Sequence, residues 1–423
     1  MRKSLTVAFA LLLGGACAFA QKGEFKWYGF VRTYFAYDSR ESTAGTEDLY
    51  FYMPKDENIV DGEDLNAIPS FRFAALTSRL GVDVLGYQYK GYKIGGKIEA
   101  DFYSGVSGVT GTAQMRLRQA FVTVAKNGAS WKIGQAWHPM AADLPDIFSL
   151  ESGAPFGPFS RTPQVYVEKS FENLSLSAAA IWQMQYTSYG PKMSGLVYTS
   201  TASADYAKYG CTPELYFALN WKPEGGLYRI GADVVSIKPR NYDYNALGAA
   251  TCKVSDHLIT TNFYLYAQQK LGNWTGKAKV TYAEDGSHFN LVGGYGVCKV
   301  NEDGSWNYTP TRSLNGWMTF TRKQKDCPWQ PQILLGYIKE FGTAEDLVSV
   351  AGANFYGKNS PNKVAQMYRI QPEVLYNLGK LQFGLEYMLT GVQYGKAEAK
   401  ALATEDLHWV ANNRVQMMVK YTF

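Results

Sequence analysis

Hydrophobic and polar residues alternate along most of the chain, and the alternation is clearest in its last stretch. From Val415 to Phe423 every odd position is apolar or aromatic. Most even positions there, such as Gln416 and Lys420, are polar. Because successive side chains of a β-strand point to opposite faces, this pattern predicts a strand with one apolar face and one polar face.

The same period recurs in about sixteen segments, and charge occupies the polar face of several of them. In the segment 92–102, Ile98 and Phe102 face one way, whereas Glu99 and Asp101 face the other. Each segment has roughly the nine to eleven residues that a tilted membrane-spanning strand needs. We therefore predict an all-β protein, a transmembrane antiparallel β-barrel of about 16 strands.

The connections between the predicted strands fall into two length classes. The short turns lie at residues 90–91, 127–128, 223–226, 271–272 and 378–380. The long loops lie at residues 39–70, 138–160, 187–210, 239–256, 285–312, 342–363 and 392–407. Outer-membrane barrels have short periplasmic turns and long outer loops, whereas a soluble sandwich has no reason to sort its loops by length.

A closed barrel explains how such strands cross a lipid bilayer. Lipid offers the backbone no hydrogen-bond partners, so strands span it only where the sheet closes. At about sixteen strands the barrel is too wide for its own side chains to fill, which leaves an aqueous lumen. We expect one barrel domain, residues 21–423, in contact with the lipid of a Gram-negative outer membrane, through which small hydrophilic solutes diffuse.

Composition and charge agree with this assignment. Aromatic residues make up 15% of the chain, with 31 Tyr and 10 Trp, and such rings gather where a barrel meets the lipid headgroups. The mean hydropathy is -0.24, and beyond the N-terminal region no apolar run reaches the ~18 residues of a helical span. The net charge of +5 is dispersed along the chain, which argues against nucleic acid as a partner.

The N-terminus has the features of a secretory signal peptide, residues 1–20. Arg2 and Lys3 precede an apolar run, and the segment ends in Ala18, Phe19 and Ala20. We expect cleavage after Ala20, and the alternative is that the chain is a lipoprotein with Cys17 as its lipidated first residue.

Four cysteines follow the predicted cleavage site, in a compartment where disulfides persist. They are Cys211, Cys252, Cys298 and Cys327. Their spacing does not define the pairing. Cys211 and Cys252 both flank predicted outer loops and are therefore candidates to pair, whereas Cys327 falls in a predicted periplasmic turn.

Basic residues collect at positions that the alternation assigns to the lumen. The predicted pore-lining residues are Arg79, Arg116, Arg118, Lys132 and Arg161, together with the acidic Glu99 and Asp101. Guanidinium groups along a narrow wet passage attract anions, and their planar fork fits a carboxylate or a phosphate. The alternative is that these arginines pair with Glu99, Asp101 and Asp83 and only brace the wall.

The segment after the fifth strand, residues 137–160, is a candidate constriction loop. It is rich in proline and aromatic residues, which should make it stiff. Its candidate site residues are His138, Asp143, Asp146, Phe156 and Phe159. Our hypothesis is that this loop folds into the lumen and narrows it, and the alternative is an outward loop that packs on a neighbouring subunit.

Several short motifs of the N-terminal part resemble one family of porins. They are the strand start Gly29–Arg32, the run Arg116–Phe121, the strand end Gly134–Gln135 before the proline-rich loop, and the run Phe159–Gln164. These motifs look like those of the DcaP-like porins, trimeric outer-membrane channels associated with uptake of dicarboxylates and other small anions. The resemblance implies a homotrimer and places Arg116, Arg118 and Arg161 in an anion-handling wall.

The end of the chain suggests a further partner. The last strand closes on Phe423 and resembles the terminal strand of outer-membrane barrels, which the barrel-assembly machinery reads. Interaction with that machinery is therefore expected.

Catalysis and bound cofactors or metals are not expected. The chain has four histidines, and none lies in a Gly-x-Ser-x-Gly or His-Glu-x-x-His motif. The acidic residues of the first long loop, among them Asp56 and Asp64, lack the spacing of a calcium site and are interpreted as a solvated loop. The alternative to a porin is a plugged, adhesin-like barrel whose long loops bind a surface partner.

Overall fold

The computed structural model describes residues 23–107, 112–194, 197–245, 249–350 and 362–423. The predicted signal peptide, residues 1–20, lies outside the described residues.

Sixteen antiparallel strands of the described residues form a closed ring, in which β26 pairs with both β25 and β1. Strands β6 and β7 are two parts of one interrupted strand beside β1. In ring order the strands are β1 (Glu24–Asp38), β6 (Ser70–Ala74) with β7 (Arg79–Tyr89), β8 (Tyr92–Ser107), β9 (Thr112–Lys126), β10 (Ala129–Trp137), β11 (Arg161–Phe171), β12 (Leu174–Ile181), β15 (Glu214–Trp221), β16 (Gly226–Ile237), β19 (Leu258–Leu271), β20 (Trp274–Glu284), β22 (Trp306–Arg322), β23 (Trp329–Thr343), β24 (Lys363–Leu378), β25 (Leu381–Ala397) and β26 (Ala403–Thr422). The predicted all-β transmembrane barrel of about 16 strands is confirmed.

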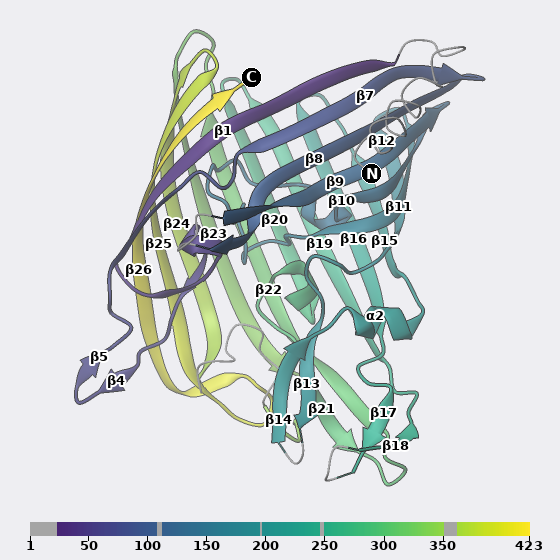
Figure 1. Ribbon diagram of the computed structural model, residues 1–423, viewed down its shortest axis with the longest axis vertical. Coiled ribbons are helices and arrows are strands. Elements are labelled where there is room, and N and C mark those ends of the chain that lie inside the picture. Colours follow the sequence, from purple (N-terminus) through teal and green to yellow (C-terminus); the bar gives the residue numbers. More distant parts are fainter. Residues whose placement is uncertain (1–22, 108–111, 195–196, 246–248, 351–361) are drawn as a thin grey trace, which may run out of the picture.

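Short elements occupy the long connections. They are β2 (Ser42–Gly45), η1 (Thr46–Asp48), β3 (Tyr50–Pro54), β4 (Ile59–Val60), β5 (Glu63–Asp64), η2 (Pro139–Ala141), β13 (Tyr189–Ser194), β14 (Val197–Ala202), α2 (Asp205–Gly210), β17 (Tyr242–Tyr244), β18 (Ala250–Lys253), η3 (Gly286–Phe289) and β21 (Tyr295–Val300), which pairs with β22. In the part of the chain that the structure describes, no helix is long and apolar enough to cross a membrane. The hairpins β13–β14 and β17–β18 lie at the lower end of the barrel in Figure 1, opposite the C-terminus.

The alternation of the sequence appears as an outer apolar face and an inner polar face. On β8, Ile98 is 56% exposed and Phe102 is 41% exposed toward the outside, while Glu99 and Asp101 are buried. The register places Asp101 opposite Arg79 of β7 on one side and Arg116 of β9 on the other. Charges of opposite sign therefore stand next to one another across three strands of the inner wall.

Exposed aromatic residues mark the end of the barrel that carries the short turns. Trp221 and Trp274 lie directly beside turns, and both are exposed. Trp329 and Tyr421 occupy corresponding places on β23 and β26. This is the girdle that a barrel presents to lipid headgroups, with a polar atom at the wet end of each ring.

The long loop expected at residues 392–407 is mostly strand. Strand β25 continues to Ala397 and β26 begins at Ala403, with Lys396 opposite Glu405. Tyr394 and Ala403 of this hairpin are buried, whereas Lys396 and Asp406 are exposed, so the alternation of lipid-facing apolar residues fades there while the backbone ladder continues. The prediction was wrong here because it depended on that alternation.

Candidate functional site

Residues 138–160, which connect β10 to β11, lie inside the barrel. The hydroxyl of Tyr34 on β1 donates to the carbonyl oxygen of Phe148 at 2.6 Å. The amide of Phe148 donates to Glu373 of β24 at 3.3 Å, and Asp143 forms an ion pair with Arg229 of β16. Strands β1 and β16 lie on opposite sides of the ring. Only a segment that crosses the lumen contacts both.

Ion pairs hold this inserted loop to the far wall. Besides the pair of Asp143 with Arg229, Asp146 accepts from the ammonium of Lys277 at 2.6 Å. Glu151 lies 3.5 Å from the guanidinium of Arg369, and both side chains are wholly buried. Charges removed from water need such partners, so these acidic residues of the loop anchor it to β16, β20 and β24.

Aromatic rings of the loop fit against glycines in the wall. A Cβ on Gly336 of β23 would lie 2.6 Å from the ring of Phe156, and one on Gly384 of β25 would lie 2.7 Å from the ring of Phe148. A glycine of the loop likewise receives a ring of the wall, because a Cβ on Gly157 would lie 2.4 Å from the indole nitrogen of Trp317 on β22. The loop therefore approaches the wall more closely than any larger residue at these positions would allow.

Two other connections also enter the lumen. Residues 49–53 of the first long connection are buried, and the hydroxyl of Tyr52 donates to the carbonyl oxygen of Asn290 at 3.0 Å. Residues 285–294 are buried as well, and the carbonyl oxygen of Phe289 accepts from the amide of Phe159 at 2.8 Å. The sequence-based interpretation of this loop concerned its acidic residues and did not indicate that its aromatic residues are covered by the barrel.

The acidic part of that first loop is only partly solvated. Asp56 is buried and lies 2.7 Å from the imidazole of His408, whereas Asp61 is exposed. Asp64 accepts from Arg40 at 2.6 Å. These partners fold the loop back onto the barrel end.

A cavity of about 340 Å³ separates the inserted loop from the wall formed by β1 and β7–β9. Its wall side carries Arg32, Thr77, Arg79, Asp101, Arg116 and Arg118. Trp137 lines this cavity and also a second one of about 330 Å³, which contains Lys132, Asp143 and Arg229. Trp137 at the root of the loop is common to both cavities, and polar and basic side chains line each of them.

The two carboxylates of this wall are shared among several arginines. Asp101 accepts two hydrogen bonds from Arg116, at 3.0 and 2.9 Å, and one from Arg118 at 2.7 Å. Glu99 accepts from Arg118 at 2.8 Å and lies 3.6 Å from Arg79. The predicted pairing of these arginines with Glu99 and Asp101 is therefore present, whereas Asp83 pairs with Lys97.

Two further arginines of the site have no carboxylate partner among the described residues. Arg32 donates to the hydroxyl of Thr77 at 3.0 Å and lies over the rings of Phe30 and Tyr34. Arg161 lies over Trp137 at 4.8 Å, and one of its terminal nitrogens is buried without a hydrogen bond. Five guanidinium groups thus face two carboxylates, which leaves an excess of positive charge beside the cavity.

The structure separates the predicted site residues into groups. Arg79, Arg116, Arg118, Asp101 and Phe159 line the first cavity, and Lys132 and Asp143 line the second. Glu99 pairs with Arg79 and Arg118. His138 and Phe156 line neither, because both are wholly covered by the wall and neighbouring loops. Arg32 was missed as a site residue, although its polar-face position in the first strand was a usable signal.

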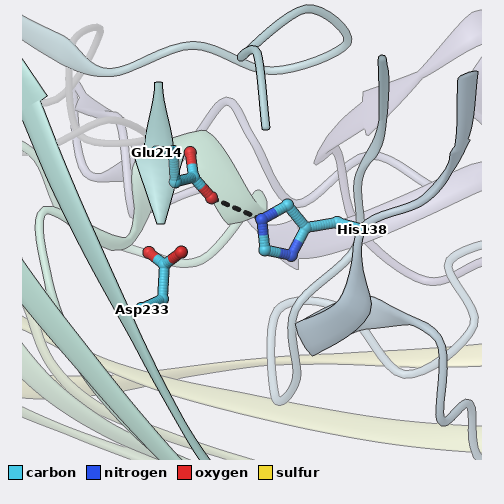
Figure 2. A group of neighbouring side chains, drawn as sticks. All are labelled: His138, Glu214 and Asp233. Carbon is cyan, nitrogen blue, oxygen red and sulfur yellow. Dashed lines mark hydrogen bonds and ion pairs between the residues drawn. The ribbon is translucent and has the colours of Figure 1, made fainter. Parts of the chain in front are cut away.

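A buried cluster at the root of the loop was also missed. Figure 2 shows His138, Glu214 of β15 and Asp233 of β16 turned toward one another. The Nδ1 atom of His138 accepts from the amide of Met140 at 3.1 Å, so its Nε2 donates to Glu214. Burial lowers the pKa of His138 to about 3, which keeps the ring neutral.

His288 of η3 lies beside the same carboxylates. Burial alone would lower the pKa of His288, but the acidic neighbours Asp233, Glu214 and Asp285 outweigh it and raise the pKa to about 9. No sequence motif indicates this cluster, because its members are separated by up to 150 positions and each comes from a different element.

All four cysteines of the described chain are unpaired. Cys211 and Cys252 are exposed, while Cys298 and Cys327 are partly exposed. The candidate disulfide between Cys211 and Cys252 is not formed. Cys327 lies in the connection from β22 to β23, at the end of the barrel that carries the short turns, as predicted.

Comparison with known families bears on the short motifs of the N-terminal part. A sequence model of the family described as DcaP outer membrane protein matches residues 16–152. The predicted resemblance to the DcaP family is confirmed. The matched residues include Arg32, Arg79, Arg116 and Arg118, and they extend into the inserted loop. No curated protein matches the sequence of this chain.

Solved structures share the fold of this DcaP-like chain. The outer membrane channel DcaP of Acinetobacter baumannii has a TM-score of 0.66 at 19% identity, covering 96% of this chain and 99% of that one. An anion-selective porin from Comamonas acidovorans has a TM-score of 0.54 at 12% identity, covering 95% and 100%. The trimer form of OmpT from Vibrio cholerae has a TM-score of 0.53 at 12% identity, with the same coverage of 95% and 100%.

The family match and the closed barrel together define the class of this protein. Over residues 16–152 the chain resembles the DcaP outer membrane proteins, and its barrel has the fold of an outer-membrane channel, which places it in the outer membrane of a Gram-negative bacterium.

Proposed function

We propose that this chain is a porin that passes small hydrophilic solutes and favours anions, including dicarboxylates. The observation that carries the proposal is the excess of guanidinium groups over carboxylates beside the cavity. Fixed positive charge in a narrow wet passage raises the local concentration of anions. The DcaP family resemblance and the fold shared with an anion-selective porin support the same conclusion.

The inserted loop, residues 138–160, forms the constriction in this proposal. It faces the arginine wall across the cavity, so a solute would pass between Phe159 and Ser149 on one side and Arg79 and Arg116 on the other. The function is passage, with discrimination by width and charge and with no chemical reaction. We further propose that the chain assembles as a homotrimer, a state that a barrel of the same fold adopts.

The arginines without carboxylate partners provide the sharpest test. In a planar bilayer with a salt gradient, the reversal potential of the wild type should have the sign of anion preference. Replacing Arg32 and Arg161 with Gln removes two of the excess charges and leaves Glu99 and Asp101 paired, so the potential should move toward zero.

Arg240→Gln is the matched control, because Arg240 pairs with Asp243 and Asp256 in an outer connection. The control should keep the potential of the wild type. Stepwise conductance with a potential that the double variant does not change would leave the porin in place and contradict the role of the unpaired arginines.

A plugged barrel that binds a surface partner is the second candidate function. It is favoured by the three connections that fill much of the lumen, residues 49–53, 138–160 and 285–294. Liposome swelling distinguishes the two. Liposomes containing a porin swell in an isosmotic solution of small solutes, whereas liposomes containing a plugged barrel do not.

A further inference from the structure

The buried cluster at the root of the inserted loop has the composition of a metal site. The ligand atoms of His138, Glu214 and Asp233 lie within 4.8 Å of one another. His288 approaches from η3, with its Nε2 atom 3.9 Å from Asp233. All four side chains are at most 3% exposed, so His288 lies beside Asp233 at the edge of a buried group of one imidazole and two carboxylates.

Two atoms of this cluster point into it without a partner. The Nδ1 atom of His288 donates to the carbonyl oxygen of Asp285 at 2.8 Å, which directs Nε2 toward the carboxylates. Within the described residues this Nε2 atom has no hydrogen-bond partner, and neither has Oδ1 of Asp233. Buried polar atoms are rarely left in this state, and an unseen ion is one of the standard explanations.

The charge balance of the cluster also favours a bound cation. In the described part of the chain, neither Glu214 nor Asp233 forms an ion pair with Lys or Arg. The ammonium group of Lys279, which lies near His138, donates to the carbonyl oxygen of Met140. Gln183 donates a hydrogen bond to Glu214 and Asn262 donates one to Asp233, but among titratable side chains of the described residues only imidazoles face these two buried carboxylates as bases. A divalent cation would neutralise both carboxylates.

We propose that His138, Glu214, Asp233 and His288 bind a single zinc ion. Two imidazole nitrogens and two carboxylate oxygens form a tetrahedral donor set that zinc accepts. A ligating histidine usually donates its other ring N–H to a carbonyl or carboxylate, and His288 already does so to Asp285. Its Nε2 atom releases its proton to solvent when it binds zinc.

His138 requires one rearrangement to join the ligands. Its Nε2 donates to Glu214, so coordination through Nε2 moves the ring proton to Nδ1. The amide of Met140 then loses its acceptor on Nδ1. The ring stays neutral throughout, and Glu214 exchanges a hydrogen bond for a bond to zinc.

The site would join three parts of the molecule. His138 begins the inserted loop, Glu214 and Asp233 belong to the wall, and His288 belongs to the buried segment 285–294. Zinc would thus fix the root of the loop to β15 and β16. This role does not depend on which solute the barrel passes.

Metal analysis of the purified, folded barrel tests the proposal. After removal of bound metal with a chelator, incubation with zinc and dialysis, the wild type should retain one zinc ion per chain. Asp233→Asn and His288→Gln should retain almost none. His408→Gln is the matched control, because His408 contacts the carboxylate of Asp56 outside the cluster, and it should retain zinc as the wild type does.

A second measurement needs no variant. Cobalt(II) loaded into the wild type should give the intense visible absorption of a tetrahedral site and should be displaced by zinc. A wild type that retains no zinc and shows no tetrahedral cobalt spectrum would overturn the proposal. Zinc retained equally by both cluster variants, with the heat-modifiable mobility of a folded barrel, would also overturn it. Neither result bears on anion preference.

Discussion

The role of each arginine in the lumen depends on which groups its guanidinium contacts. Arg116 and Arg118 bind carboxylates of the wall, Arg32 and Arg161 have aromatic neighbours instead, and Arg369 holds a loop. Guanidinium groups suit all three roles because they stay charged and present donors in a plane. At the scale of single residues, the excess of positive charge beside the cavity therefore depends on two positions, Arg32 and Arg161.

Arg369 and Glu151 should behave as a coupled pair. Arg369→Met leaves the wholly buried Glu151 without a cation, which should cost about 3–5 kcal/mol of stability. Adding Glu151→Gln removes the unpaired charge and should restore part of that loss. Thermal unfolding and the rate of proteolysis within residues 138–160 measure both effects in a double-mutant cycle.

Arg312→Met serves as the control, because within the described ranges Arg312 donates to the carbonyl oxygens of Gly342 and Thr343 and forms no ion pair. It should change stability much less. Equal losses in the single and double variants would show that the charge pair does not hold the loop.

The sequence predicts which residues face the lumen better than it predicts their partners. Period-two alternation places Glu99 and Asp101 on the inner face, and the structure agrees. It does not show that Asp101 binds Arg116 and Arg118 together, because that depends on the register between neighbouring strands. A shift of one residue would exchange the two faces, and no local pattern fixes that register.

At the scale of elements, the inserted loop is held at both charged and apolar points. Ion pairs join it to β16, β20 and β24, and glycines of β23 and β25 receive its aromatic rings. So many separate contacts should keep its position fixed during passage of a solute. The conductance of the channel should therefore depend on the loop more than on the outer hairpins.

Deleting residues 150–159 should raise the single-channel conductance, because this stretch fills the space between the cavity and the walls of β22 and β23. Deleting residues 59–62 is the control, since this hairpin tip is exposed. The control should leave the conductance unchanged. Equal conductance in the wild type and in the variant lacking residues 150–159 would show that the loop does not limit the current.

The amino-acid composition of the two inserted connections explains why the sequence predicts the burial of one and not of the other. Prolines and aromatics between residues 137 and 160 indicate a stiff, covered segment. The first long connection carries its aromatics, such as Phe51 and Tyr52, between acidic residues, and this average polarity indicates solvent. Burial of Phe51 depends on Arg369 and Arg414, whose guanidinium groups lie over its ring and which are more than 300 residues away.

At the scale of the whole molecule, the seam between β1 and β26 closes the ring. The amide of Phe423 donates to the carbonyl oxygen of Gly29 at 3.1 Å. A Cβ on Gly29 would lie 2.5 Å from the ring of Phe423 and 2.6 Å from the carbonyl oxygen of Arg79. Glycine at this position lets three chain segments meet at one point of the seam.

Gly29→Ala should weaken the closed barrel by about 1–3 kcal/mol, the usual cost of overpacking. The temperature at which the folded band disappears in semi-native electrophoresis measures the effect. Gly276→Ala is the control, because a Cβ there would meet its nearest atom, on Phe320, at an ordinary 3.6 Å. Equal temperatures for both variants would contradict the close fit at the seam.

The same seam sets an order of events during biogenesis. Phe30 lies opposite Thr422 and Asp38 lies opposite Arg414. The first strand of the barrel therefore cannot complete its backbone pairing until the last strand has been synthesised. Contacts between such distant residues form late and slowly. Until β26 pairs with it, β1 exposes unpaired backbone groups that can hydrogen-bond to a second chain. A chaperone or an assembly factor that shields β1 through this interval would therefore increase the yield of folded protein. A chain truncated before β26 would never complete the pairing of β1, so the factor would stay bound to that strand.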